Sequence, residues 1–273
     1  MWFDTHAHLQ DNDFKEDLPD VLARARAQGV ERIMLAASTE GDSNDACRLA
    51  LKHPMLYAAV GIHPHEASSW DIQMGDRLHW LVEKTNKKAT ERSRDPVVVA
   101  WGEIGLDFHY DHSPRDVQAK VFRKQLEWAH RLDLPVIIHM RDATARALEI
   151  LEKAYDDGLF STEHPAGVVH CYSGSPETLR PLLSWGFMIG FDGPITFAKS
   201  KQPKASLAAV PLDRLVLETD APWLTPTPYR GKRNESSYLP FIGEAAAEIK
   251  AMPVEDIARI TTKNALRLFR IDA

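Results

Sequence analysis

Short apolar runs alternate with longer amphipathic segments along this chain. The runs occupy residues 2–9, 32–38, 56–63, 97–105, 134–140, 166–172, 186–191 and 214–221. Several of them, such as VVVAWGEIG at 97–105, are apolar at almost every position. Strands of a parallel sheet show this pattern because both of their faces are covered. The runs therefore predict eight parallel strands.

Segments with the spacing of amphipathic helices lie between these runs and after the last one. The clearest are residues 14–29, 114–132, 141–158, 235–251 and 254–269. Gly29 and Gly158 suit the C-terminal ends of helices, and Ser113-Pro114 suits a helix start. The polar segment 84–96 (KTNKKATERSRDP) is expected to be a solvated loop.

The alternation of strands and helices predicts the fold class. Eight such units in 273 residues favour an α/β fold, a (β/α)8 TIM-like barrel, which needs about 250 residues. We expect a single domain over residues 1–273. An open doubly wound sheet is the alternative, and the lack of a GxGxxG motif after the first run weakens its nucleotide-binding form.

Charge and cysteine usage narrow the classes of function. The formal net charge is −6 and the pI about 6.1, so no general basic field attracts nucleic acid. An anionic substrate would need a local basic cluster or a metal. The two cysteines form no CxxC motif and fit a reducing compartment. With no signal peptide and no apolar run of about 20 residues, we expect a cytoplasmic protein without a membrane segment.

Ionisable residues follow five of the predicted strands. They are His6, His8, Glu103, His139, His170 and Asp220. The carboxyl ends of barrel strands meet at one mouth, so these side chains are expected to converge there. Crowding four imidazoles and two carboxylates together costs desolvation free energy, unless cations compensate for the lost water contacts. Two divalent metals bridged by a carboxylate would use all six groups.

The spacing of these residues also predicts orientations. Residues two apart in a strand share a face, so Asp4, His6 and His8 are expected to point the same way. By the same alternation, Cys171 should point away from His170, toward the helix layer, as a buried and inert thiol. A single histidine after an apolar run is usually a packed residue, and it is the conjunction of six groups that favours a metal site.

Seven motifs together resemble the TatD family of metal-dependent hydrolases. They are FDTHAHL, GIHPHE, GEIGLDFHY, PVIIHMRDA, HCYSG, ETDAPWLTP and RGKRNE, and they occur in the family's order. The resemblance extends from residue 3 to the tail segment TTKNALRLF. One departure is Ser236, where the family usually has proline after RNE. This substitution concerns a loop near the mouth, and so substrate handling rather than metal binding.

The resemblance implies an amidohydrolase-type barrel with one or two divalent metal ions, of which Mg, Mn and Zn are candidates. It implies that His6 and His8 bind one metal, that His139 and His170 bind the second, and that Glu103 bridges them. Asp220 would be a ligand and the proton acceptor, so Asp220 and Glu103 are the expected catalytic residues. Members of the family are deoxyribonucleases, often acting from the 3′ end of single strands, so single-stranded DNA ends are the expected partner.

Residues for substrate binding are less marked in the sequence. The resemblance places His63 in the substrate pocket, and Arg141 and Arg233 are nearby candidate cations. Basic residues also follow the last two predicted strands, namely Lys199, Lys201, Lys204, Arg230 and Lys232. Each is as compatible with a solvated loop as with a phosphate clamp. Trp223 and Tyr229 are candidates for base stacking, with core packing as the more common role.

Two other functions fit the same residues. A metal-dependent esterase or amidohydrolase on small substrates, or on aminoacyl-tRNA esters, would use the same chemistry, because fold does not fix substrate. A non-catalytic protein with a structural metal is disfavoured, since structural zinc sites are usually closed and rich in cysteine. No obligate protein partner is evident from the sequence.

Overall fold

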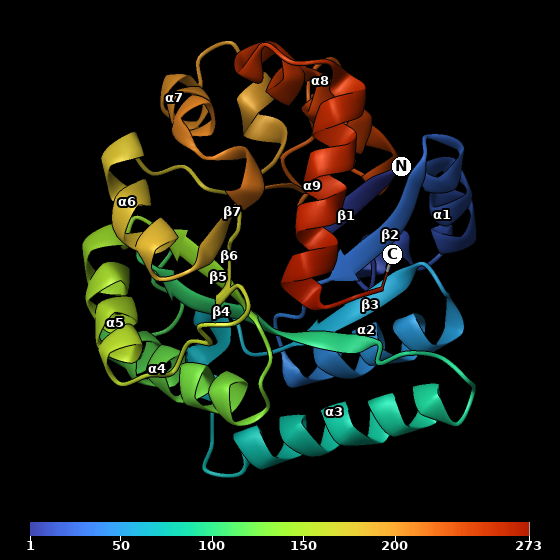
Figure 1. Cartoon of the computed structure of the whole chain (residues 1–273). Coiled ribbons are helices and arrows are strands. Elements are labelled where there is room, and N and C mark those ends of the chain that lie inside the picture. The colour runs from blue at the N-terminus through green and yellow to red at the C-terminus, as the bar shows by residue number, and fades with distance from the viewer. Residues whose placement is uncertain (273) are drawn as a thin grey trace.

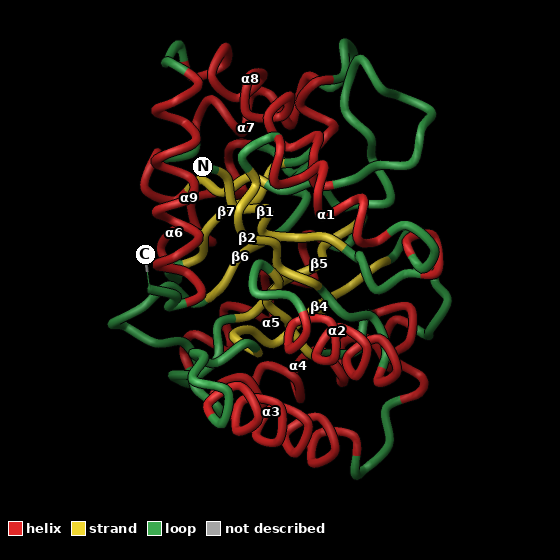
Figure 2. Tube along the Cα trace, turned by 90° about the vertical axis from the view of Figure 1, so that its right-hand side faces the viewer, coloured by secondary structure: helices red, strands yellow, loops and turns green. Residues whose placement is uncertain are grey.

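The computed structural model of the protein describes residues 1–272. Within this range, eight parallel strands form one sheet in chain order. They are β1 (Trp2–Ala7), β2 (Val30–Leu35), β3 (Leu56–Val60), β4 (Val98–Asp107), β5 (Val136–Arg141), β6 (Gly167–Val169), β7 (Phe187–Phe191) and β8 (Leu215–Leu217). Figure 2 shows these strands at the centre of the molecule with helices around them.

The first and last strands approach each other and close the sheet. A parallel bridge joins Ala7 to Ala221, just beyond β8. The amide of His8 donates to the carbonyl of Ala221 at 2.7 Å, and the amide of Asp220 donates to the carbonyl of His6 at 2.9 Å. The predicted (β/α)8 barrel is therefore confirmed, and the open sheet is excluded.

Helices follow the strands and form the outer layer (Figure 1). They are α1 (Leu18–Ala27), α2 (Glu40–Lys52), α3 (Met74–Thr90), α4 (Arg115–Arg131), α5 (Thr144–Asp156), α6 (Pro176–Ser184), α7 (Lys201–Ala209), α8 (Leu239–Lys250) and α9 (Val254–Phe269). No helix in residues 1–272 combines the length and the apolar character needed to cross a bilayer.

The interpretation of residues 84–96 as a loop is wrong for its first half, because α3 continues to Thr90. The buried positions Val82, Thr85 and Ala89 have helical spacing, but Thr85 is polar and hides the pattern. Two other predicted helices begin later than expected. Short 3-10 turns, Asn12–Phe14 and Ser236–Tyr238, precede α1 and α8.

One group of buried residues fills the interior of the barrel near the amino ends of the strands. Every strand contributes to it, from Phe3 on β1 to Val216 on β8. Ala265, Leu268 and Phe269 of α9 pack against this group, and the rings of Phe3 and Phe269 lie 5.7 Å apart. The last turns of α9 therefore close this end, which leaves the carboxyl ends of the strands as the open mouth.

A buried carboxylate ties the seam between β1 and the segment after β8. Asp4 accepts hydrogen bonds from the amide of Thr219 at 2.9 Å and from its hydroxyl at 2.6 Å. Asp4 thus faces Thr219, and the expectation that it shares a face with His6 and His8 is wrong. The pairing of β1 with β2 shifts register between Asp4 and Ala7, which interrupts the simple alternation.

Replacing Asp4 should loosen this seam. We expect Asp4→Ala to lower the free energy of unfolding by about 1–3 kcal/mol, because two donors of Thr219 lose their buried acceptor. Asp4→Asn keeps an acceptor and should cost less. Urea unfolding measures both, with the exposed Asp156→Ala as a control expected within about 0.5 kcal/mol of wild type. Equal stability of Asp4→Ala and wild type would contradict the assignment.

Candidate active site

Glu103 lies at the centre of the predicted cluster. It sits in the middle of β4, and not at the strand end where the sequence suggested it. Its side chain is almost fully buried. The strand continues to Asp107, with a register shift against β5 between Trp101 and Ile104. The carboxylate therefore projects from within the barrel wall toward side chains of other strands.

One oxygen of Glu103 faces the two histidines from the start of the chain. Its Oε2 lies 3.4 Å from Nε2 of His6 and 3.7 Å from Nε2 of His8. These two nitrogens are 3.0 Å apart. Asp220 joins the same side, with its Oδ1 3.7 Å from Nε2 of His6 and 3.6 Å from Nε2 of His8.

The other oxygen of Glu103 faces a second set of imidazoles. Its Oε1 lies 2.8 Å from Nδ1 of His139 and 2.7 Å from Nε2 of His170. Nε2 of His63 is 3.6 Å from the same oxygen. The structure thus brings the other five predicted ligands together around Glu103, three on one side and two on the other, with the buried His63 beside Oε1 as well.

Burial and charge act against each other in this cluster. Burial alone would raise the pKa of Glu103, but the surrounding imidazoles hold that pKa well below its usual range. Burial, with the neighbouring His170, lowers the pKa of His6 to about 4. Burial opposes the charge on His139, yet Asp107 and Glu103 raise the pKa of that ring to about 9. The centre therefore holds an ionised carboxylate beside imidazoles of differing protonation.

The donor atoms fit divalent cations. The Nε2 atoms of His6 and His8 face each other at 3.0 Å, where only one proton can lie between them. Groups of three ligand atoms within 4.8 Å of one another include His6, His8 and Glu103, and also His63, Glu103 and His139. A divalent ion beside each oxygen of Glu103 would accept the lone pairs of the facing imidazole nitrogens. A ligand set of imidazole nitrogen and carboxylate oxygen suits Zn²⁺ or Mn²⁺.

A second layer of acidic residues orients the histidines. Oδ2 of Asp107 lies 3.0 Å from Nε2 of His139 and 3.1 Å from Nε2 of His65. Glu218 accepts the amide of Cys171 at 2.5 Å, and its Oε1 lies 3.7 Å from Nδ1 of His170. Sequence reasoning missed Asp107 and Glu218. The signal was spacing, because Asp107 is four residues from Glu103 in one strand and Glu218 is two residues from Asp220.

The predicted orientation of Cys171 is wrong. Its Sγ lies within 4.8 Å of carboxylate oxygens of Asp192 and Asp220, so the side chain faces the mouth rather than the helix layer. Strand β6 ends at Val169, and Cys171 has a φ of +45°, so strand alternation no longer applies. Burial and the acidic neighbours raise the pKa of this thiol well above its usual value, so it stays protonated and unreactive at neutral pH.

The predicted substrate-binding residues lie around the mouth but differ in their surroundings. His63 is buried beside Glu103. The guanidinium of Arg141 lies over the ring of Tyr110, 4.8 Å from its centre. Arg233 forms a two-pronged pair with Asp17, at 2.9 and 2.7 Å, and so ties the segment after β8 to the turn before α1.

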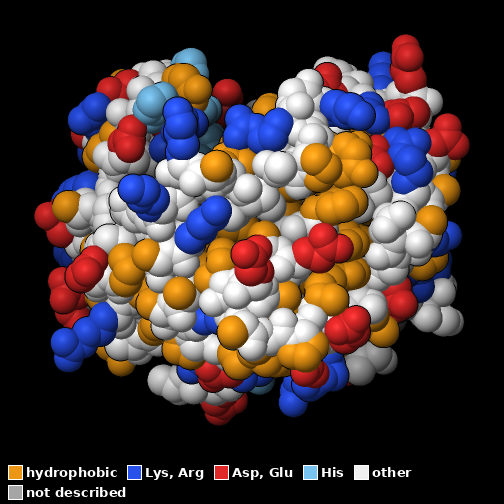
Figure 3. All heavy atoms as spheres, turned by 90° about the horizontal axis from the view of Figure 1, so that it is seen from above, with side chains coloured by type: hydrophobic (Ala, Val, Ile, Leu, Met, Phe, Trp, Pro, Cys, Tyr) orange, Lys and Arg blue, Asp and Glu red, His pale blue; other side chains and the backbone are white. Residues whose placement is uncertain are grey.

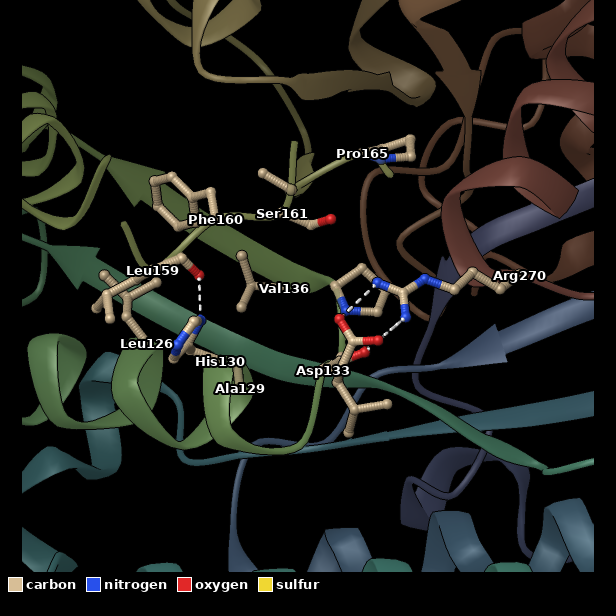
Figure 4. A pocket seen from close by; sticks show the side chains of 13 residues that line it. Leu126, Ala129, His130, Asp133, Val136, Leu159, Phe160, Ser161, Pro165 and Arg270 are labelled. Carbon is tan, nitrogen blue, oxygen red and sulfur yellow. Dashed lines mark hydrogen bonds and ion pairs between the residues drawn. The ribbon is translucent and has the colours of Figure 1, made fainter. Parts of the chain in front are cut away.

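A hollow away from Glu103 also opens on the surface. In Figure 3, histidine side chains gather at one place along the edge of the face shown, beside a notch in the surface. A different cavity of about 180 Å³ lies between the end of α4 and the start of β5 and β6, lined by His130, Asp133, Phe160 and Arg270 (Figure 4). The ion pair between Asp133 and Arg270 crosses its edge. It lies at the amino ends of the strands, away from Glu103.

A (β/α)8 barrel with histidines and carboxylates converging at its mouth defines a class, the metal-dependent hydrolases of ester and amide bonds. Residues 3–270 match the model of the TatD related DNase family, and the chain belongs to that family. The enzyme is thus a metal-dependent hydrolase that acts on ester bonds. The family membership expected from the seven motifs is confirmed.

Individual relatives cover the whole chain. The uncharacterized metal-dependent hydrolase YabD of Bacillus subtilis (strain 168) is 43% identical over 273 residues, 100% of both chains. The 3'-5' ssDNA/RNA exonuclease TatD of Cronobacter turicensis is 34% identical over 273 residues, 98% of this chain and 97% of that protein. The crystal structure of YJJV, a TatD homolog from Escherichia coli K12, superposes with a TM-score of 0.88 at 30% identity and covers 99% and 98% of the two chains.

Divalent metal should stabilise the folded chain through Glu103. At a metal concentration 100 times the dissociation constant, linkage adds about 2.7 kcal/mol and raises the melting temperature by about 5–10 °C. Differential scanning calorimetry with Mn²⁺ measures the shift. Glu103→Gln should lose most of it, whereas His130→Gln, at the opposite end of the barrel, should keep it. A full shift in Glu103→Gln would exclude this carboxylate as a ligand.

Metal binding should also release protons near neutral pH. With a pKa of about 9, His139 is protonated at pH 7.5 and must lose its proton before Nδ1 binds a metal. The apparent affinity should therefore rise as pH rises toward 9. Titration calorimetry in buffers of different ionisation enthalpy counts the protons. Asp107→Asn removes the charge that holds this proton and should reduce the release; an unchanged count would contradict the argument.

Proposed function

We propose that this enzyme hydrolyses phosphodiester bonds at the 3′ end of single-stranded DNA, with two divalent ions held on the two sides of Glu103. The observation that carries the proposal is that the two carboxylate oxygens of Glu103 face two separate sets of imidazoles. Two-metal sites of this type are common in nucleases. The Cronobacter relative, named as a 3'-5' exonuclease of single-stranded DNA and RNA, supports the choice of substrate.

The roles of the ligands follow from their positions. We infer that His6 and His8, with Asp220, hold one ion, and that His139 and His170 hold the other, with Glu103 between them. His6 comes from β1 and Asp220 from the segment after β8, so the whole barrel is needed to assemble the site. This supports the proposal that the chain acts as one catalytic domain.

The two free cysteines support a reducing, cytoplasmic location.

Asp220 is placed to act as the general base. Divalent ions held by these ligands would polarise the phosphate ester and lower the pKa of the attacking water. Asp220 has its pKa held below the usual range by His8, His6 and His170, against the effect of burial, and so is ionised and able to accept the proton of an attacking water. The water oxygen then bonds to phosphorus as the bond to the 3′-oxygen of the preceding nucleotide breaks, and that oxygen takes up a proton from solvent to leave as a hydroxyl.

Other side chains of the mouth position the substrate in this proposal. His63 lies 3.6 Å from Glu103 and has a pKa well below its usual value, chiefly through burial, so it meets the phosphate as a neutral imidazole. Arg141 and Arg233 are the proposed contacts for phosphates farther from the centre. Arg233 must share its guanidinium with Asp17, so we expect the smaller contribution from it.

Asp220→Asn should slow this chemistry strongly while leaving the fold intact. We expect the rate of nucleotide release to fall by about 10²- to 10⁴-fold, the usual contribution of a general base. The assay follows a 5′-labelled single-stranded oligonucleotide with Mg²⁺ or Mn²⁺, where stepwise shortening from the 3′ end is the expected product ladder. His130→Gln, far from the mouth, should match wild type.

Two outcomes would contradict the proposal. An intact oligonucleotide with metal-loaded wild-type protein, together with rapid turnover of a small ester, would assign the site to small or aminoacyl esters. Cleavage that survives unchanged in Asp220→Asn would remove that residue from the chemistry.

A further inference from the structure

An exposed aromatic ring stands at the edge of the candidate metal centre. Trp223 follows Asp220 by three residues and is 51% exposed. Its ring centre lies 4.9 Å from that of His8, with the two planes at 65°. The indole therefore contacts a proposed ligand edge to face while about half of its surface remains open to solvent. A large apolar ring in this position adds little to the core.

The backbone on both sides of this ring is held in place. The amide of Trp223 donates to the carbonyl of Asp220 at 2.9 Å, and its carbonyl accepts from Nδ2 of Asn234 at 2.6 Å. The carbonyl of Leu224 packs so closely against Gly193 that a Cβ there would lie 1.7 Å from it. The ring thus projects from a pinned segment, and binding a ligand on it requires little further ordering.

Other aromatic rings near the mouth already have neighbours stacked on them. Tyr229, the other stacking candidate of the sequence, lies against Tyr238 with ring centres 4.5 Å apart and planes at 7°. Tyr110 has the guanidinium of Arg141 over it at 4.8 Å and His112 stacked at 5.6 Å. Trp223 is more exposed than Tyr229 but no more exposed than Tyr110, which is 53% exposed. It differs from both in its contact with His8, a proposed ligand in the cluster around Glu103.

We propose that Trp223, with the partly exposed Leu224 beside it, forms a nucleobase subsite that receives the base next to the scissile phosphate. A phosphate bound at the metal centre on the His8 side would carry its nucleoside past this ring. Stacking on an aromatic side chain is available to every base, so the subsite selects for an unpaired end rather than for a sequence. A base within a duplex is already stacked and paired, so it cannot use the ring. This inference rests on the proposed function.

The test compares two single-stranded oligonucleotides that differ only in whether the 3′-terminal nucleotide carries a base. Wild type should prefer the complete oligonucleotide in kcat/KM by about 5- to 150-fold, the range that stacking of one base supplies. Trp223→Ala should lose this preference through a higher KM, and Trp223→Phe should keep most of it. Trp80→Ala removes another exposed tryptophan, on α3, and should behave like wild type.

Binding separates this inference from the proposed function. In the Asp220→Asn background, fluorescence anisotropy gives the affinity for both oligonucleotides without cleavage. If wild type cleaves nothing but Trp223 still sets the preference in binding, the proposed function fails and the subsite stands. If Trp223→Ala weakens both oligonucleotides equally, or if neither assay distinguishes them, Trp223 only supports His8 and the subsite is refuted.

Discussion

The central constraint in this protein is one ionised carboxylate buried among imidazoles. Glu103 stays charged in a site where burial alone would neutralise it, because histidines from four other segments point their nitrogens at its two oxygens. Those histidines in turn need partners, and Asp107 supplies one to His139. Protein groups alone therefore compensate the carboxylate charges and imidazole lone pairs of this cluster poorly. Divalent cations would compensate both. The rest of the barrel serves to bring these groups together.

Barrel closure makes this convergence possible, and the sequence predicts it well. Regular alternation of apolar runs and amphipathic helices defined the strands, since burial sets the apolar pattern directly. What the sequence could not predict were features fixed by contacts between distant segments. The helical face of residues 84–90 includes the buried Thr85, and Asp4 turns to Thr219 because the register of β1 shifts. Neither effect leaves a local pattern.

The candidate ligands were also foreseeable, since ionisable residues directly after apolar strands are rare without a reason. All six come together in the structure. The orientation of Cys171 and the position of Glu103 within β4 were not foreseeable, because both depend on backbone irregularities. Arg233 and Asp17 are far apart in the chain, so the sequence could not show that the guanidinium of Arg233 is paired with this carboxylate. The positions of Asp107 and Glu218, close in sequence to Glu103 and Asp220, did offer a signal. Residues that orient ligands can be recognised only after the ligands themselves have been placed.

The most direct test of the central claim is anomalous X-ray diffraction from crystals of the Mn²⁺-loaded protein. The account predicts two manganese peaks, one at each carboxylate oxygen of Glu103, the first beside His6 and His8 and the second beside His139 and His170. A single peak, or two peaks that leave Glu103 uncoordinated, would contradict the claim that this carboxylate bridges the centre.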